Sequence, residues 1–280
     1  MLRALAYRNY RLFFGGQVVS LVGTWITTTA INWLVYRLTG SAVMLGTVAF
    51  ASQVPSFLLG PFAGIIVDRI DRHRLLVVTQ TISMLQSLAL AGLVFSGHVT
   101  IGWLVALGVV QGLVNAFDMP ARQSFLLTMI ENKEDLGNAI ALNSSMVNLA
   151  RLVGPSIAGV VIAAVGEGWC FAIDGISYIA VIIALLRMRI APAPARPARE
   201  RHAVAEFVEG WHYAFGFHPI RAVILLLAVV SLVGVPYSVL MPVSHSAPRS
   251  APHPDAVMRS PSVCGPPWKT LVANTGIRTL

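Results

Sequence analysis

The charged stretch GIIVDRIDRHR, residues 64–74, is unusual in a chain in which only 11% of residues are charged. Asp68, Arg69 and Arg72 lie at its centre, and Gly64 comes one helical turn before Asp68. Acids and bases this close can pair with loop backbone or with a facing surface, and such contacts can form in one conformation and break in another. The plainer interpretation is a solvated turn whose bases follow the positive-inside rule.

Arg151 and Asp174 interrupt two other long apolar segments. If Arg151 lies about 13 residues into its helix, it is about 20 Å deep, where a bare Arg costs at least about 3 kcal/mol. Asp174 is expected within about one helical turn of the same depth, so an ion pair across a helical hairpin is geometrically open. Two interpretations remain: a static structural pair, or a pair on the path of a substrate or a proton.

The apolar segments that carry these charges are long enough to cross a membrane. Hydrophobic residues make up 56% of the chain, and a spanning helix needs about 20 predominantly apolar residues. Because the segments have no polar face, an apolar soluble protein is the poorer interpretation. We therefore predict an all-α membrane protein, with a six-helix bundle followed by a seventh transmembrane helix. The expected spans lie near residues 12–36, 44–67, 75–96, 100–117, 138–165, 168–187 and 220–241.

Basic residues are concentrated in the connections on one side of these spans. Arg3, Arg8 and Arg11 precede the first span, whereas the opposite connections carry few bases, among them Arg37. Short cytoplasmic loops carry an excess of Lys and Arg, so the N-terminus is expected in the cytoplasm. These loops account for the net charge of +8. Without a stacking platform or a recognition fold, the charge predicts no nucleic-acid partner.

The sequence has no residues at the spacing of a catalytic or metal site. Cys170 and Cys264 are not spaced as a disulfide or a metal ligand pair, and the His residues show no ligand spacing. A G-x-x-x-x-G-K-[ST] loop for a nucleotide is absent from the sequence. We predict a chain that is not an enzyme, that needs no cofactor or metal, and whose first partner is the lipid bilayer.

Two similar stretches suggest an internal repeat. LLGPFAGIIVD, residues 58–68, is echoed by LVGPSIAGVVI, residues 152–162. Spans two and five would then be equivalent partners in an inverted repeat of three spans. A chance match is the alternative, because Gly, Pro, Ala and Val are common in membrane helices. In the second copy, Pro155 removes a backbone bond while Gly154 and Gly159 remove side-chain bulk, which allows bending and close packing.

The chain resembles the major facilitator superfamily of secondary transporters, in its bacterial efflux branch of siderophore and macrolide exporters. The resemblance implies alternating access, export of a small-molecule substrate with a proton as the coupling ion, and a place in the bacterial inner membrane. It implies a gating role for Gly64, Asp68, Arg69 and Arg72. It also implies an antiporter element at Gly154, Pro155 and Gly159. The stretches that carry it are YRNYRLFFGGQVVSLVGTWI, GIIVDRIDRHR, AFDMPARQSFLLTMI and DLGNAIALNSSMVNLARLVGPSIAG.

The sequence departs from the family pattern at two positions. Asp71 replaces the usual second Gly of the signature loop, which makes a tight turn less easy but adds a helix-compatible acid. Gly108 stands where the fourth span usually has an Arg, which puts a proton-coupling role for that span in doubt.

Several uncharged polar residues fall at membrane depth, and the candidates for lining a cavity are Gln17, Gln111 and Asn115. Interhelical hydrogen bonds are the simpler interpretation of such residues. We further expect Pro120 to end the fourth span and Arg122 to lie in a cytoplasmic turn.

The resemblance covers about residues 7 to 243. Residues 188–219 are predicted to be a cytoplasmic linker, and residues 244–280 a disordered tail outside the family pattern. We expect a truncated or frame-shifted copy of a transporter, whose facing wall would come from self-association or from a missing C-terminal half. The alternative is a membrane fragment or scaffold that does not transport.

Overall fold

The computed structural model describes residues 3–130, 132–189, 216–217, 221–223 and 225–226. Val243–Leu280 forms a separate unit of the chain and lies outside the described residues. The same holds for most of the expected linker and most of the expected seventh span. These two expectations, like the disordered tail, therefore stay predictions.

The described part of the chain is helical and contains no strand. After a short 3₁₀ turn at Arg3–Ala6 come six long helices, each apolar enough to cross a membrane. This confirms the predicted all-α membrane class. The helices are α1 (Arg8–Thr39), α2 (Ala42–Arg69), α3 (Arg72–Phe95), α4 (Ile101–Thr128), α5 (Lys133–Val165) and α6 (Glu167–Leu186).

Helix α4 differs from the expectation because it does not end at Pro120. The expected span closed at residue 117, whereas the helix continues through the proline to Thr128. Proline removes one backbone hydrogen bond from a helix interior. Tertiary packing offsets this loss, since Ala116, Ala121 and Phe125 on either side of the proline are buried.

Short capped turns join the helices. Ser41, Asp71, Thr100 and Asn132 each accept a hydrogen bond from a backbone N–H in the first turn of the helix that follows. Gly40 closes α1 with a φ of 60° and donates its N–H to the carbonyl of Tyr36, a left-handed conformation that glycine adopts without a steric penalty.

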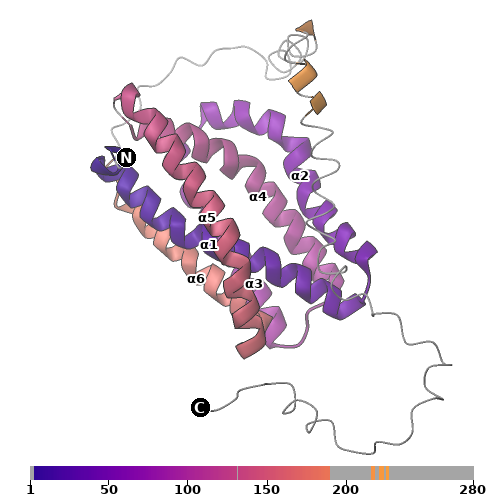
Figure 1. Cartoon of the computed structure of the whole chain (residues 1–280). Helices are drawn as coiled ribbons and strands as arrows, with labels where there is room; N and C mark the ends of the chain where they lie inside the picture. The colour runs from indigo at the N-terminus through magenta and orange to yellow at the C-terminus, as the bar shows by residue number, and fades with distance from the viewer. Residues whose placement is uncertain (1–2, 131, 190–215, 218–220, 224, 227–280) are drawn as a thin grey trace, which may run out of the picture. The chain divides into compact units, whose positions relative to one another are not determined.

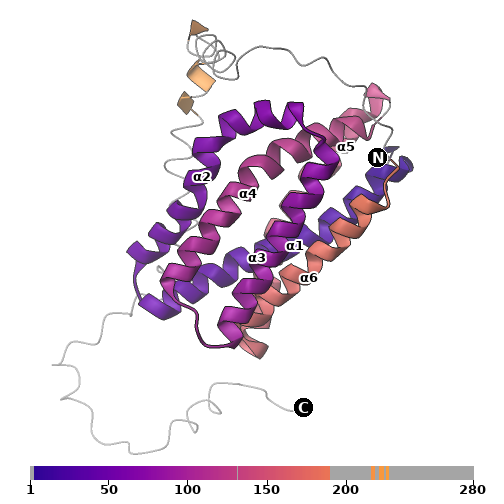
Figure 2. The same cartoon turned by 180° about the vertical axis from the view of Figure 1, so that it is seen from behind.

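Consecutive helices are, for the most part, not the main packing partners. Helix α1 packs most extensively against α6 and then α5, α2 packs against α4, and α3 packs against α6 and α4. Figures 1 and 2 show α1 running beside α6 and α2 running beside α4. Both views also show a bend in α2, which contains Pro55 and Pro61.

The packing pattern supports the internal repeat. If α1, α2 and α3 are exchanged with α4, α5 and α6, the α2–α4 contact becomes α5–α1 and the α1–α6 contact becomes α4–α3. The α3–α6 contact becomes itself. All five of these contacts are among the extensive ones, as an inverted repeat of three helices requires.

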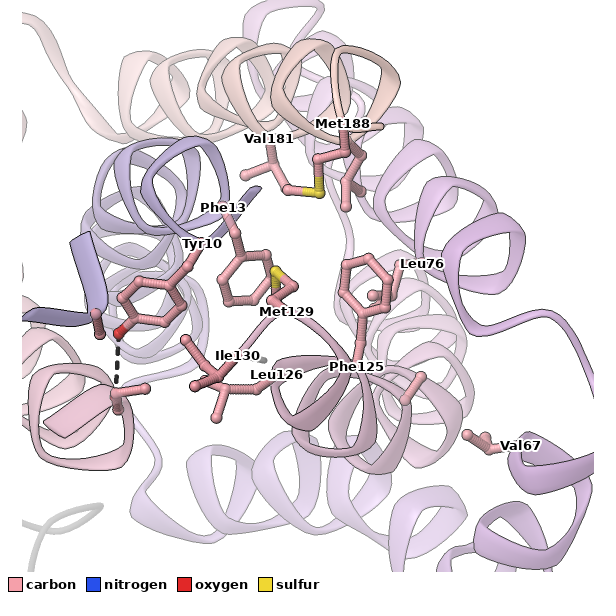
Figure 3. Packing of buried hydrophobic residues seen from close by; sticks show 14 residues of the cluster. Tyr10, Phe13, Val67, Leu76, Phe125, Leu126, Met129, Ile130, Val181 and Met188 are labelled. Carbon is pink, nitrogen blue, oxygen red and sulfur yellow. Dashed lines mark hydrogen bonds between the residues drawn. The ribbon is translucent and has the colours of Figure 1, made fainter. Parts of the chain in front are cut away.

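Two apolar clusters fill the bundle, one toward each end. The cluster in Figure 3 joins Tyr10 and Phe13 of α1 to Phe125 and Leu126 of α4, and to Val181 of α6. Its one drawn hydrogen bond runs from the Tyr10 hydroxyl to the carbonyl of Ala139, at 3.0 Å. The second cluster is built around Ile26, Leu34, Leu45, Leu90 and Phe171.

A layer of buried polar side chains separates these two clusters along the helices. We call this set the polar layer. Its members come from α1, α3, α4 and α6, and the buried ones are Gln17, Ser20, Thr27, Thr79, Gln80, Ser83, Gln86, Ser87, Asp118, Asp174 and Ser177.

Candidate functional site

Asp118 of α4 is the acid at the end of the polar layer nearer the turn from α2 to α3. Its side chain is buried, and its Oδ1 accepts hydrogen bonds from Thr79 Oγ1 and Gln80 Nε2, both at 2.8 Å. Its Oδ2 pairs with the guanidinium of Arg122, one turn later on the same helix. Arg122 in turn donates from Nη1 to Gln17 Oε1 of α1, at 3.0 Å. One ion pair between a buried acid and a partly buried base therefore ties α1, α3 and α4 together.

Asp174 of α6 is the second acid of the layer, and it is only 1% exposed. Its Oδ2 accepts a hydrogen bond from Ser87 Oγ of α3 at 2.7 Å. A Cβ added to Gly23 of α1 would lie 2.7 Å from Asp174 Oδ1 and 2.6 Å from Ser177 Oγ. The glycine is therefore required for α1 to approach the acid this closely.

Polar side chains of α3 lie between the two acids. Thr79, Gln80, Ser83, Gln86 and Ser87 are all buried, and their spacing puts them on one side of the helix. We call this set the α3 polar ladder. Thr79 and Gln80 donate hydrogen bonds to Asp118. Ser87, at the other end of the ladder, donates to Asp174.

The cavity candidates are in or beside this network. Gln17 receives the hydrogen bond from Arg122 described above and is 1% exposed. Gln111 donates from Nε2 to Ser83 Oγ at 3.3 Å and to Asn115 Oδ1 at 3.1 Å. The structure thus brings all three next to polar neighbours inside the bundle, while a role in binding a substrate stays a prediction.

The expected ion pair between Arg151 and Asp174 is wrong, because no ion pair among the described residues joins them. Arg151 is exposed and its guanidinium lies 4.9 Å from the ring centroid of Trp25 in α1, a cation–π contact. The two charges cannot pair because they lie at different depths along their helices. Counted from the turn at Gly166, Arg151 is about 22 Å along its helix and Asp174 about 12 Å along the next.

The signature stretch forms the turn from α2 to α3. Asp68 Oδ1 and Arg72 Nη2 are 2.8 Å apart across this turn, and the Asp68 side chain is 63% exposed. Asp71 has a φ of −62° and caps α3 by accepting from the backbone N–H of His73 and Arg74. The turn therefore has no need of the usual glycine at this position. His73 Nε2 lies 2.9 Å from the carbonyl of Leu185, which holds the start of α3 against the end of α6.

The glycine–proline element of α5 lies where this helix meets α1. A Cβ added to Gly154 would lie 2.4 Å from the Trp25 Cβ, so this glycine allows the close approach. Gly159 has open space at its Cβ position, as has Gly64 of α2. Helix α5 continues through Pro155, which is exposed.

Comparison with known proteins accounts for this architecture. The family described as transmembrane secretion effector, a branch of the major facilitator superfamily, matches residues 2–258. The chain belongs to this family. The match takes in the first residues of the segment that was expected to lie outside the family pattern.

Curated relatives of the chain are transporters and efflux proteins. The chain is 32% identical to the staphyloferrin A transporter of Staphylococcus aureus over 68% of its own length. It is 30% identical to the multidrug efflux pump Tap of Mycolicibacterium fortuitum over 75% of its length. To the macrolide efflux protein A of Streptococcus pyogenes it is 24% identical over 82%. These matches cover 48%, 52% and 62% of the relatives, so the chain spans about half the length of the curated relatives it matches.

The family and its relatives agree with the prediction that the chain is not an enzyme, because their names are those of a secretion effector, transporters and efflux proteins. They also support the prediction of a multi-pass membrane protein of the efflux type.

The ion pair between Asp118 and Arg122 is not among the contacts expected from the sequence. From the sequence, Asp118 is not a candidate site residue, and Arg122 is expected in a cytoplasmic turn after Pro120. The structure corrects this placement, since α4 carries both residues inward and Arg122 is only partly exposed. A signal was present in the stretch DMPAR, where an acid and a base are four residues apart and therefore on one helix face. The proline between them suggested a helix end and hid this relation.

Proposed function

We propose that this chain forms one wall of a secondary transporter that exports small molecules across the bacterial inner membrane. Transport would proceed by alternating access, driven by a proton gradient, with the N-terminus in the cytoplasm. The family membership and the names of the relatives support export as the activity. The substrate classes to test first are those in the relatives' names: siderophores, macrolides and mixed drugs.

The observation that carries this proposal is the environment of Arg151. Its guanidinium is exposed on the bundle, 14 residues before the end of α5, which is about 21 Å along the helix. A charge at this depth is stable only against protein, water or a polar ligand. The exposed face around Arg151 and Trp25 is therefore the side on which a substrate path would lie.

The facing wall would be a second six-helix bundle, because alternating access moves one bundle against another around a central site. It would come from a second copy of this chain or from a C-terminal half. The exposed Asp68, with Gly64 and Arg69 near the end of α2 and Arg72 at the start of α3, lies where such a wall could contact it. In this proposal the contact closes one conformation and breaks in the other.

The proposal is tested by substituting Arg151 in the complete transporter and measuring efflux from whole cells. Arg151→Ala should abolish efflux without loss of membrane insertion, and Arg151→Lys, which keeps the charge, should retain part of it. Leu152→Ala is the matched control, because this neighbour is 73% exposed and uncharged. Unchanged efflux by Arg151→Ala would refute a substrate-path role.

Two further measurements separate the proposal from its alternatives. An uncoupler that dissipates the proton gradient should stop efflux, and efflux that continues would exclude the proton as the coupling ion. If cells that express this chain export none of the three substrate classes, the alternative of a non-transporting membrane fragment or scaffold is favoured.

A further inference from the structure

The polar layer contains buried hydrogen-bonding atoms that the protein itself does not satisfy. Six of the seven such side-chain atoms found among the described residues belong to this layer or adjoin it. The seventh, Arg72 Nε, lies at the turn from α2 to α3. The six are Gln17 Nε2, Thr27 Oγ1, Gln80 Oε1, Gln111 Oε1, Arg122 Nε and Asp174 Oδ1.

Their gathering in one layer needs a physical explanation. Buried polar atoms are nearly always hydrogen-bonded, because an unpaired one costs about 1–3 kcal/mol. Ordered water that bonds to about three otherwise unsatisfied groups is the common solution. The six atoms include both donors and acceptors, as the donors and acceptors of a water molecule require.

The unsatisfied atoms extend from one buried acid to the other. Gln17, Gln80 and Arg122 surround Asp118, and Gln111 bonds to Ser83 halfway along the ladder. Asp174 Oδ1 lies at the other end, where the Thr27 hydroxyl is near enough to interact with it although no hydrogen bond of good geometry forms. Thr79 and Ser87, which bond directly to the two acids, are about 12 Å apart along α3. That distance is far longer than one hydrogen bond of about 3 Å.

We propose that water binds along the α3 polar ladder and joins Asp118 to Asp174 in one continuous hydrogen-bonded path. The path runs inside the bundle, between the two apolar clusters, from Asp118 of α4 to Asp174 of α6. Water between two acids is a route for protons, so this path is a candidate for the proton of the proposed function. The proposal that water binds here does not require the chain to be a transporter.

Radiolytic hydroxyl labelling of the purified chain in detergent or nanodiscs tests this inference. Radiolysis of bound water forms hydroxyl radicals in place, which modify a buried aromatic ring beside the water but not one in a dry core. Tyr178 is the reporter, because it is 5% exposed and its hydroxyl lies 3.5 Å from Thr24 Oγ1, one turn after Asp174. Tyr10, 1% exposed within the apolar cluster, is the matched dry control.

We expect Tyr178 to be modified several-fold more than Tyr10 at the same dose. Thr27→Val, which replaces the hydroxyl beside Asp174 by a methyl group, should lower Tyr178 labelling at least about twofold. Thr29→Val is its control, since the Thr29 hydroxyl already bonds to the carbonyl of Trp25 at 2.9 Å. Equal protection of the two tyrosines, or Tyr178 labelling that Thr27→Val leaves unchanged, would overturn the inference. Because labelling measures water and not efflux, either result leaves the proposed function to its own test.

Discussion

Asp118 and Arg122 show how a single buried pair depends on its surroundings. Removing two charges from water costs several kcal/mol, and the mutual attraction offsets this only with further hydrogen bonds. Here Thr79 and Gln80 donate to the acid, and Gln17 accepts from the base. The pair is stable because three helices complete it.

Arg122→Gln should therefore destabilise the bundle by about 3–5 kcal/mol, because it leaves the Asp118 carboxylate buried and unpaired. Thermal unfolding in detergent measures the loss. Adding Asp118→Asn should recover a large part of it, since the double variant has no charge left at this pair. The control is Arg72→Gln, whose partner Asp68 is largely exposed and whose pair contributes at most about 1 kcal/mol. Equal destabilisation by the two single variants would contradict the prediction.

At the scale of the helices, close packing depends on a few glycines at chosen positions. Gly112 of α4 could carry no side chain, since an added Cβ would lie 2.2 Å from the carbonyl oxygen of Ser52 in α2. Ser56 of α2 donates to the carbonyl of Gly112 at 2.6 Å. Gly154 has the same role where α5 meets α1. The α2–α4 and α1–α5 contacts are equivalent in the repeat, and each requires a glycine for the two helices to approach this closely.

Gly154→Ala should destabilise the protein by about 1–3 kcal/mol, because the new methyl group overlaps the Trp25 side chain and forces α5 away from α1. Gly159→Ala is the matched substitution on the same helix, and it should be neutral or stabilising by up to about 1 kcal/mol through helix propensity. Both values come from thermal unfolding. If the two variants behave alike, Gly154 is not the point of close approach.

The sequence predicted the helices well and their side-chain partners poorly. Apolar length alone indicates long helices, because a bilayer demands long, uninterrupted spans, and the described residues form six of them. The end of α4 was wrong since Pro120 signals a stop, and only tertiary packing overrides that signal. The pairing of Arg151 with Asp174 was wrong because it assumed that α5 and α6, joined by a short turn, face each other at equal depth. In the structure these charges have different partners, Trp25 and Ser87.

At the scale of the whole molecule, the six helices alternate in direction, so their connections lie on two sides. His98 lies in the turn between α3 and α4, and Arg74 lies in the first turn of α3 at the opposite end. The proposed orientation puts His98 outside the cell and Arg74 inside.

A membrane-impermeant maleimide tests this orientation in intact cells. In a chain with Cys170→Ala and Cys264→Ser, the variant His98→Cys should be labelled from outside. Arg74→Cys should be labelled only after the cells are opened. Both positions are exposed, so burial does not prevent the reaction. The reverse pattern would place the N-terminus outside and overturn the assignment.

The extensive contact between α1 and α6 has a consequence for biogenesis. The last residue of α1 is Thr39 and the first of α6 is Glu167, so at about 5–20 residues per second the ribosome needs about 6–26 seconds to add the missing partner. During that time lipid would occupy the helix surface at Gly16 and Gly23, which packs against Val181 and Ser177 in the finished bundle. We therefore expect newly made α1 to lack its most extensive packing partner until α6 emerges, and a ribosome that stalls before that point leaves the helix without it.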